Sequence, residues 1–243
     1  MTIHPLSFAA LKHALAEGWQ IANATRGVSI LYSLVFVLGG VLIMGSLLAK
    51  GMTPFIIAAA GAFMLIGPPI LAGFFGIAAA HEAGKKVTAK AIFAGFKNAA
   101  GALWALALVC GLLFMIFVTD AAILYAYMVG GAPVWMVDLI PAAANVVKFV
   151  LWAGISGFVV AFLLFGVSAF SVPLLCERRA GLVQSVVLSV RVVFGNFGIA
   201  IFWAFLLSTV VIASVLFLPV LPLTLPWLAY ASRSLYRQAL PIA

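Results

Sequence analysis

Charged residues are scarce in this chain of 243 residues: they make up 7% of it, whereas hydrophobic residues make up 67%. Soluble domains typically carry about 25% charged residues, so this composition excludes an ordinary soluble domain. Most segments are apolar on every side, which a helix tolerates where lipid surrounds it. We therefore predict an all-α polytopic membrane helix bundle that forms a single domain over residues 1–243.

Histidine and acidic residues are too few to support catalysis or redox chemistry within a bilayer. His4, His13 and His81 all flank apolar runs, so a bis-histidine haem site or a copper centre cannot be built at mid-depth. Asp120 and Lys148 lie toward one end of their runs, where they can pair. Phosphate-binding loops, nucleophile elbows and zinc-ligand spacings are also missing. The sequence predicts no enzyme activity, no metal and no cofactor.

Cysteine is equally scarce. Cys110 lies inside one apolar run and Cys176 at the edge of another. Since the two are expected at different depths in the membrane, a disulfide framework is excluded.

The basic residues are distributed unevenly between the apolar runs. Six runs are close to the ~20 residues that a membrane helix needs, at roughly residues 28–49, 54–80, 100–128, 147–175, 197–216 and 218–234. With six crossings, only Lys50 and Lys148 of the 13 Lys and Arg fall on one side. The positive-inside rule makes the other side cytoplasmic, which predicts a bacterial inner-membrane protein with both termini in the cytoplasm. A kinked final helix that does not cross is the alternative, and it would place Arg233 and Arg237 outside.

The net charge of +8 comes from basic residues that flank apolar segments. This placement favours contact with anionic lipid headgroups, at about 1 kcal/mol for each cation, over binding to nucleic acid. The candidate headgroup residues are Lys85, Lys86, Arg178 and Arg179.

Amphipathic segments precede the first, third and fifth spans. They occupy about residues 8–22, the stretch after Thr88, where Thr88 can cap a helix, and the stretch after Arg179. We therefore expect three units, at about residues 1–84, 85–178 and 179–243, each an interfacial helix followed by a two-span hairpin. The second span of each unit carries candidate kink positions, namely Pro69, Pro173 and Pro226. They indicate either kinked packing or hinges around a cavity.

Small residues recur at four-residue spacing within two spans, which favours close helix packing in lipid. They are Ala72, Gly76, Ala80, Gly157 and Ala161.

The connection at residues 129–146 is long and strongly apolar for a segment outside the membrane. It is interpreted either as a short helix on the membrane surface or as a docking patch for a membrane-protein partner. The candidate docking residues are Val134, Trp135, Met136, Leu139 and Ile140.

Two phrases carry a family resemblance. One is Gly67-Pro68-Pro69 leading to His81-Glu82-Ala83-Gly84-Lys85, and the other is Ser171-Val172-Pro173-Leu174-Leu175-Cys176-Glu177-Arg178. They resemble domain-of-unknown-function family 2189 of bacterial integral membrane proteins. The resemblance implies a membrane fold without an established activity. Some members carry a cytochrome c oxidase label, which conflicts here with the lack of membrane-embedded histidines needed by a catalytic subunit.

These observations predict a non-catalytic accessory subunit or assembly factor that packs against membrane lipids and a larger membrane complex, such as a respiratory oxidase. The alternative is a transporter or lipid-handling protein with a cavity between the second, fourth and sixth spans, lined by Ser168, Ser171, Ser208 or Thr224. An enzymatic site from His81, Glu82 and Glu177 at the inner surface has little support, because their spacing does not require them to meet.

Overall fold

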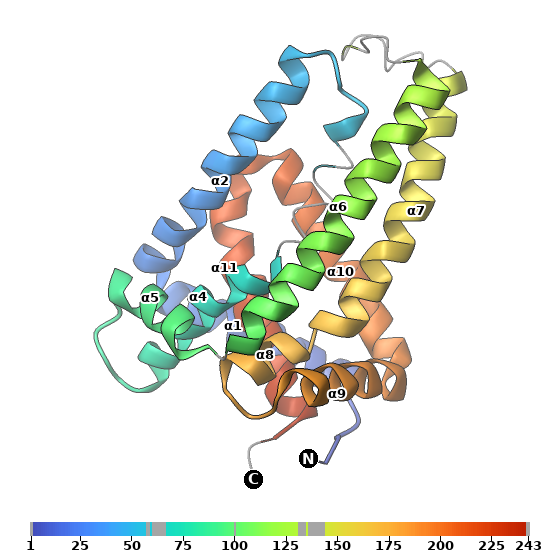
Figure 1. The fold of residues 1–243 in the computed structure, drawn as a ribbon. Coiled ribbons are helices and arrows are strands. Elements are labelled where there is room, and N and C mark those ends of the chain that lie inside the picture. Colours follow the sequence, from blue (N-terminus) through green and yellow to red (C-terminus); the bar gives the residue numbers. More distant parts are fainter. Residues whose placement is uncertain are drawn as a thin grey trace.

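The computed structural model describes residues 2–56, 59, 67–99, 101–130, 135 and 144–241, and these residues form helices without a β-strand. The helices, shown in Figure 1, are α1 (Phe8–Ala24), α2 (Arg26–Ala49), α4 (Gly67–Glu82), α5 (Ala89–Asn98), α6 (Gly101–Val129), α7 (Ala144–Ser168), α8 (Ser171–Cys176), α9 (Leu182–Gly195), α10 (Phe197–Leu216), the 3₁₀ turn η2 (Leu218–Val220) and α11 (Leu221–Ala239).

Four helical segments are long and apolar enough to cross a membrane. They are α2, α6, the α7–α8 segment Ala144–Cys176, and α10. The predicted second span corresponds to α4, which has only 16 described helical residues, and part of that span lies outside the described residues. The predicted sixth span corresponds to α11, whose second half is rich in polar residues. The membrane bundle is confirmed, whereas the six-span arrangement is not.

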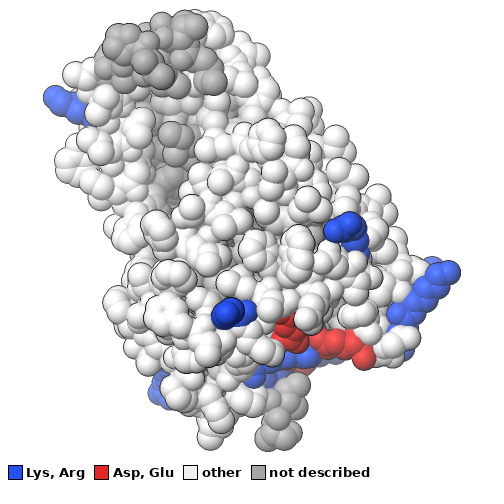
Figure 2. All heavy atoms as spheres, turned by 180° about the vertical axis from the view of Figure 1, so that it is seen from behind, with Lys and Arg blue, Asp and Glu red and all other residues white. Residues whose placement is uncertain are grey.

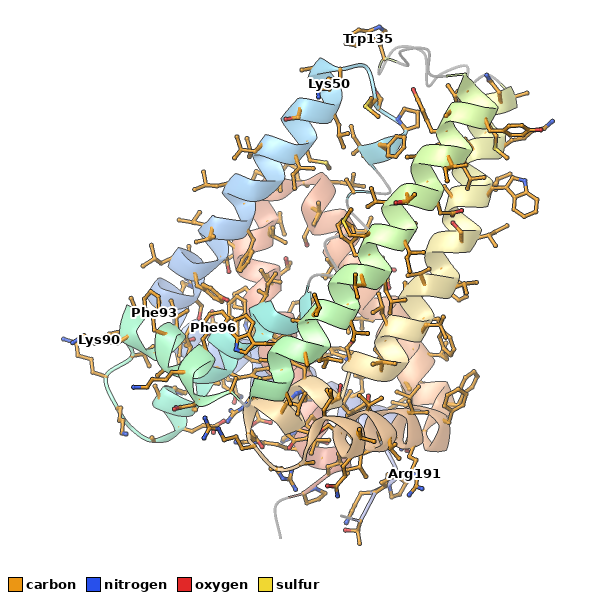
Figure 3. All side chains as sticks on the ribbon, in the orientation of Figure 1. Lys50, Lys90, Phe93, Phe96, Trp135 and Arg191 are labelled. Atoms are coloured by element: carbon orange, nitrogen blue, oxygen red, sulfur yellow. The ribbon has the colours of Figure 1, made fainter. Side chains whose placement is uncertain are left out.

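The two ends of the bundle differ in charge. Lys50 lies at one end, and Lys90 and Arg191 lie at the opposite end together with both termini (Figures 1 and 3). We call these the Lys50 end and the basic end. The rear view in Figure 2 shows acidic side chains gathered beside basic ones near the basic end, with most of the remaining surface uncharged.

Helices α1, α5 and α9 occupy the predicted amphipathic segments, near the basic end. Helix α1 begins after Ser7, whose Oγ accepts a hydrogen bond from the Ala10 amide at 3.1 Å. Thr88 precedes α5 but makes no side-chain cap, contrary to the prediction, although its backbone is extended as an N-cap requires. Both α5 and α9 leave large apolar side chains exposed, including Phe93 and Phe194.

Helix α11 forms the centre of the bundle near the basic end. Its Tyr230, Arg233 and Tyr236 are all buried. Helix α1 packs so closely on it that a Cβ at Gly18 would lie 2.6 Å from the Ala231 nitrogen. Of the α1 stripe that the sequence predicted to lie in the membrane interface, Leu11 and Ala22 are buried against protein, whereas Phe8 and Trp19 are exposed.

The candidate kink prolines occupy different helical positions. Pro69 lies in α4, close to the first described residue of that helix, and Pro173 lies in the first turn of α8, just after the break that follows Ser168. A proline in the first turn removes no helical hydrogen bond. Pro226 is inside α11, where the hydrogen bond to the residue four positions earlier is lost.

The small residues of α4 lie against α5. A Cβ on Gly76 would approach the Ala91 carbonyl oxygen to 2.3 Å, and a Cβ on Gly95 would approach the Ala72 oxygen to 2.1 Å. Gly157 of α7 similarly faces the Phe117 ring of α6, at 2.9 Å. Ala80 of α4 and Ala161 of α7 are partly buried and pack against buried apolar side chains. The contacts of these small residues are thus made within the chain.

Candidate functional site

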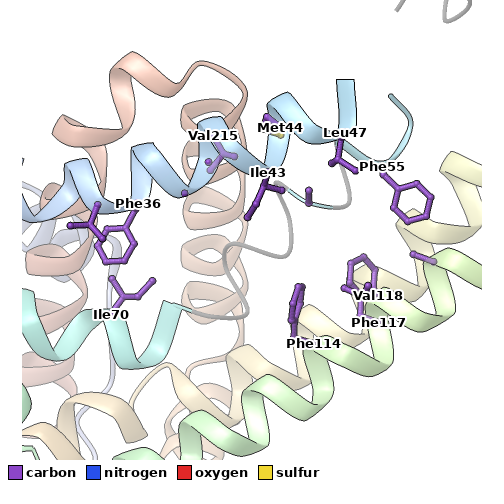
Figure 4. A pocket seen from close by; sticks show the side chains of 15 residues that line it. Phe36, Ile43, Met44, Leu47, Phe55, Ile70, Phe114, Phe117, Val118 and Val215 are labelled. Atoms are coloured by element: carbon purple, nitrogen blue, oxygen red, sulfur yellow. The ribbon is translucent and has the colours of Figure 1, made fainter. Parts of the chain in front are cut away.

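A cavity of about 470 Å³ lies between α2 and α6, and Figure 4 shows its lining. Helix α2 contributes a face that runs from Val35 to Leu47, and α6 contributes Phe114 and Phe117. Phe55, Ile70 and Val215 close other parts of the wall. Every described lining residue is apolar, and the cavity is partly open to its surroundings.

Two adjacent glycines on α2 account for part of the space. A Cβ on Gly39 would meet no heavy atom within 4 Å, whereas one on Gly40 would face a Leu218 methyl at 2.7 Å. Water is not present to drive apolar helices together within a bilayer, so such a gap does not close by hydrophobic collapse. The walls can hold a hydrocarbon chain and disfavour polar ligands, because unpaired polar groups are costly to bury.

A second cavity, of about 140 Å³, lies between α4, α7, α10 and α11. This is close to where the sequence predicted a cavity lined by hydroxyl groups. Ser168 lines it, but its hydroxyl donates to the Leu164 carbonyl at 2.6 Å. Ser171, Ser208 and Thr224 are not among its described lining residues. The Thr224 hydroxyl instead donates to Ser214 at 2.8 Å.

Four charged residues form an ion-pair cluster at the basic end. Glu82 ends α4 and Glu177 follows α8, while Arg233 and Arg237 lie one turn apart on α11. The Nη2 atoms of Arg233 and Arg237 lie 3.5 and 3.1 Å from Glu177 Oε1. Glu82 receives hydrogen bonds from both guanidinium groups, including 3.1 Å contacts from Arg233 Nη2 and Arg237 Nη1. The cluster therefore joins three helices through α11.

The Arg233 side chain is only 6% exposed, so its charge depends on the two carboxylates for compensation. Burial by itself would raise the pKa of Glu82. The hydrogen bonds and positive charges of Arg233 and Arg237 outweigh this effect and hold the pKa of Glu82 below its ordinary value. Glu82 is thus kept ionised in the cluster.

The candidate headgroup residues fall into two groups. Arg178 donates to the Asn98 carbonyl at 2.7 Å, and Arg179 donates to the Leu240 carbonyl at 2.7 Å. Both arginines therefore satisfy carbonyl groups at the ends of helices, α5 and α11 respectively. Lys85 and Lys86 are exposed in the loop between α4 and α5. Lipid-headgroup contact remains a prediction for all four.

The comparison with protein families covers just over half of the chain. A family model described as predicted integral membrane protein (DUF2189) matches residues 55–177. The chain belongs to the DUF2189 family. No curated protein and no solved structure matches it.

The DUF2189 match includes α4 to α8, and hence the α6 wall of the large cavity as well as Glu82 and Glu177. Helix α2 and the arginines of α11 lie outside the matched residues. Each candidate site in this DUF2189 protein therefore combines the matched region with a flanking helix.

The predicted pairing of Asp120 with Lys148 is not observed among the described ion pairs of the DUF2189 chain, and the Oδ2 atom of Asp120 is buried without a hydrogen bond from any described residue. The helix register explains this. The rings of Tyr125 and Phe149 lie 5.3 Å apart. Lys148 is therefore roughly level with residue 126, about 9 Å along the axis from Asp120 at 1.5 Å per residue.

Of the predicted docking residues, Trp135 lies at the Lys50 end and is 48% exposed (Figure 3). Val134, Met136, Leu139 and Ile140 lie outside the described residues. His81 is exposed, and no group of three His, Cys, Asp or Glu suited to a metal ion occurs within the described part of the DUF2189 chain.

Proposed function

We propose that this DUF2189 protein is a non-catalytic inner-membrane protein that handles lipid by binding one hydrocarbon chain between α2 and α6. The observation that carries the proposal is the 470 Å³ cavity with its apolar described lining. Small-molecule sites typically measure about 300–1,000 Å³, so the volume suits a ligand. The same lining argues against a polar transported substrate.

The length of the cavity supports a lipid as the occupant. Val35 and Leu47, at its two ends on α2, are twelve residues apart. This separation corresponds to about 18 Å of helix. One leaflet contributes half of the ~30 Å hydrocarbon core of a bilayer, so the cavity has the depth of one acyl chain. If the basic end faces the cytoplasm, as the positive-inside rule predicts, the chain comes from the opposite leaflet.

A phospholipid with a photoactivatable diazirine in its acyl chain tests this proposal in native membranes. After illumination and proteolysis, we expect crosslinked peptides from α2 and α6. Gly39→Phe should fill the cavity, because a Cβ at Gly39 meets no heavy atom within 4 Å, and it should abolish these crosslinks.

Gly45→Phe is the matched control. Gly45 lies on the same helix, also has no heavy atom within 4 Å of its Cβ position, and does not line the cavity. Crosslinks that survive in Gly39→Phe, or that disappear equally in both variants, would contradict a lipid site in the cavity.

The accessory-subunit or assembly-factor role beside a larger complex, such as a respiratory oxidase, is the second candidate. It is supported by the exposed Trp135 at the Lys50 end, although tryptophan also favours membrane interfaces in general. Crosslinking from position 135 in native membranes tests it. A crosslinked partner protein supports this role, and adducts with lipid alone would contradict it.

A further inference from the structure

Lys50 directly follows α2, whose residues line the cavity. Along α2, the residues Phe36, Gly40, Ile43 and Leu47 line the wall at steps of three and four, the spacing of one helical face. The next position on this face is Lys50, immediately after the helix ends. The apolar wall thus leads directly to a cation at the Lys50 end.

The turn after α2 fixes this position. Gly51 has φ +65°, and the Met52 amide donates to the Leu47 carbonyl at 2.9 Å. This is the Schellman arrangement that ends a helix sharply at a glycine. The chain then returns to the cavity, because Phe55 is again a lining residue. Lys50 consequently lies on the turn that connects two parts of the cavity wall, Leu47 and Phe55.

Lys50 is exposed and makes no ion pair with any described residue. Asp120 lies deeper in the bundle, since Phe55 contacts Tyr125 with ring centroids 5.0 Å apart and Asp120 is five residues below that level on α6. These five residues correspond to about 7 Å of helix. Within the described part of the chain, no carboxylate therefore competes with an anion for the Lys50 ammonium group.

We infer that the occupant of the cavity is an anionic glycerophospholipid whose phosphate binds Lys50 while its acyl chain lies between α2 and α6. This inference rests on the proposed lipid-binding function. The Lys50 ammonium group suits the phosphate of such a lipid, and the apolar wall suits its acyl chain. In a bilayer the phosphate lies at the membrane surface and the acyl chain lies below it, in the same order as Lys50 and the wall. Its acyl chain would leave the cavity at the level of the headgroups, where Lys50 stands.

Native mass spectrometry of the full chain in detergent tests the inference through titration with dioleoyl phosphatidylglycerol and dioleoyl phosphatidylcholine. The two lipids have the same acyl chains and differ in headgroup charge. A lysine near a lipid surface contributes about 1 kcal/mol, so Lys50→Gln should weaken phosphatidylglycerol binding about fivefold and reduce its preference over phosphatidylcholine. Lys50→Arg should retain the preference.

Lys148→Gln is the matched control, because Lys148 is the other lysine predicted on this side and lies on α7, which contributes no described residue to the cavity lining. It should leave both affinities unchanged. Equal losses in Lys50→Gln and Lys148→Gln would overturn the inference by showing a diffuse charge effect, as would an unchanged preference in Lys50→Gln.

Gly39→Phe separates the two proposals. Loss of both lipids in this variant, combined with no effect of Lys50→Gln, would leave the acyl-chain site standing and refute the headgroup contact. Undiminished binding of both lipids in Gly39→Phe would refute the cavity site, and the headgroup contact with it. Thermal denaturation of each variant verifies that the compared proteins are folded.

Discussion

Helices α11 and α6 have opposite relations to their surroundings. Helix α11 carries Arg233, Ser234 and Tyr236, yet it buries most of its residues in the centre of the bundle. Helix α6 is apolar apart from a few residues, yet it exposes large side chains such as Leu108 and Ile116. In this membrane protein, the more polar helix is thus the more buried one.

This difference between α11 and α6 arises because lipid, and not water, surrounds the apolar helices. An apolar side chain is as stable in contact with lipid tails as in contact with a neighbouring helix. The apolar surface of α6 therefore provides little driving force for packing against other helices. Charged and hydroxyl groups need partners, and α11 provides them for glutamates from α4 and from the turn after α8. The half of the bundle near the basic end is held by specific contacts, whereas the half near the Lys50 end leaves a cavity.

The largest expected effect comes from removing the cation at the centre of the ion-pair cluster. Arg233→Met should lower the free energy of unfolding by about 3 kcal/mol, because it leaves Glu82 and Glu177 with less compensation in a partly buried site. Thermal denaturation in a mild detergent measures the change. Arg191→Met, at an exposed position, should have little effect. Equal stability of these two variants would show that the cluster does not hold this half together.

A smaller effect is expected at the contact between α4 and α5. Gly76→Val should lower the free energy of unfolding by roughly 2 kcal/mol, since its side chain would overlap the Ala91 carbonyl and overpack the interface. Gly45→Val on the exposed part of α2 has open space around its Cβ and should be nearly neutral. Thermal denaturation of both variants compares the two halves. A comparable loss at Gly45 would contradict the difference in packing.

The smallest effect concerns pH. The pKa of Glu82 is lowered in the folded state from its ordinary value of 4.5. Its stabilising contribution is therefore complete above about pH 4.5 and is lost as the pH falls toward the lower folded value. The denaturation midpoint should decline below about pH 4.5, and the decline should be shallower in Arg233→Met. An identical pH profile for the variant would show that this ion pair does not cause the decline.

The sequence was sufficient to predict the helical membrane class, four of the spans and the positions of the amphipathic helices. Long apolar runs and helical periodicity are local signals, and α2, α6, α7 and α10 follow from them. The central place of α11 was not predictable in this way. Glu82 and Arg233 are separated by 151 residues, and nothing in their local sequence indicates that they meet.

The candidate site was predicted only in part. The prolines and hydroxyl groups predicted a cavity between α4, α7 and α11, and the structure has the smaller cavity in this region. The larger cavity depends on the spacing between α2 and α6, which tertiary packing determines. Its available sequence signal was the Gly39-Gly40 pair in the middle of a span, where two successive side chains are missing.

The position of α11 has a consequence for biosynthesis. Domains form from the N-terminus during translation, at about 5–20 residues per second, and α11 is synthesised after every other described helix. Glu82 and Glu177 therefore emerge from the ribosome well before Arg233 and Arg237 exist. Until then, these two glutamates must rely on water or another cation. Closure of the bundle around α11 is thus a late step, and nascent chains that stop before Arg233 would expose unpaired carboxylates to quality-control proteases.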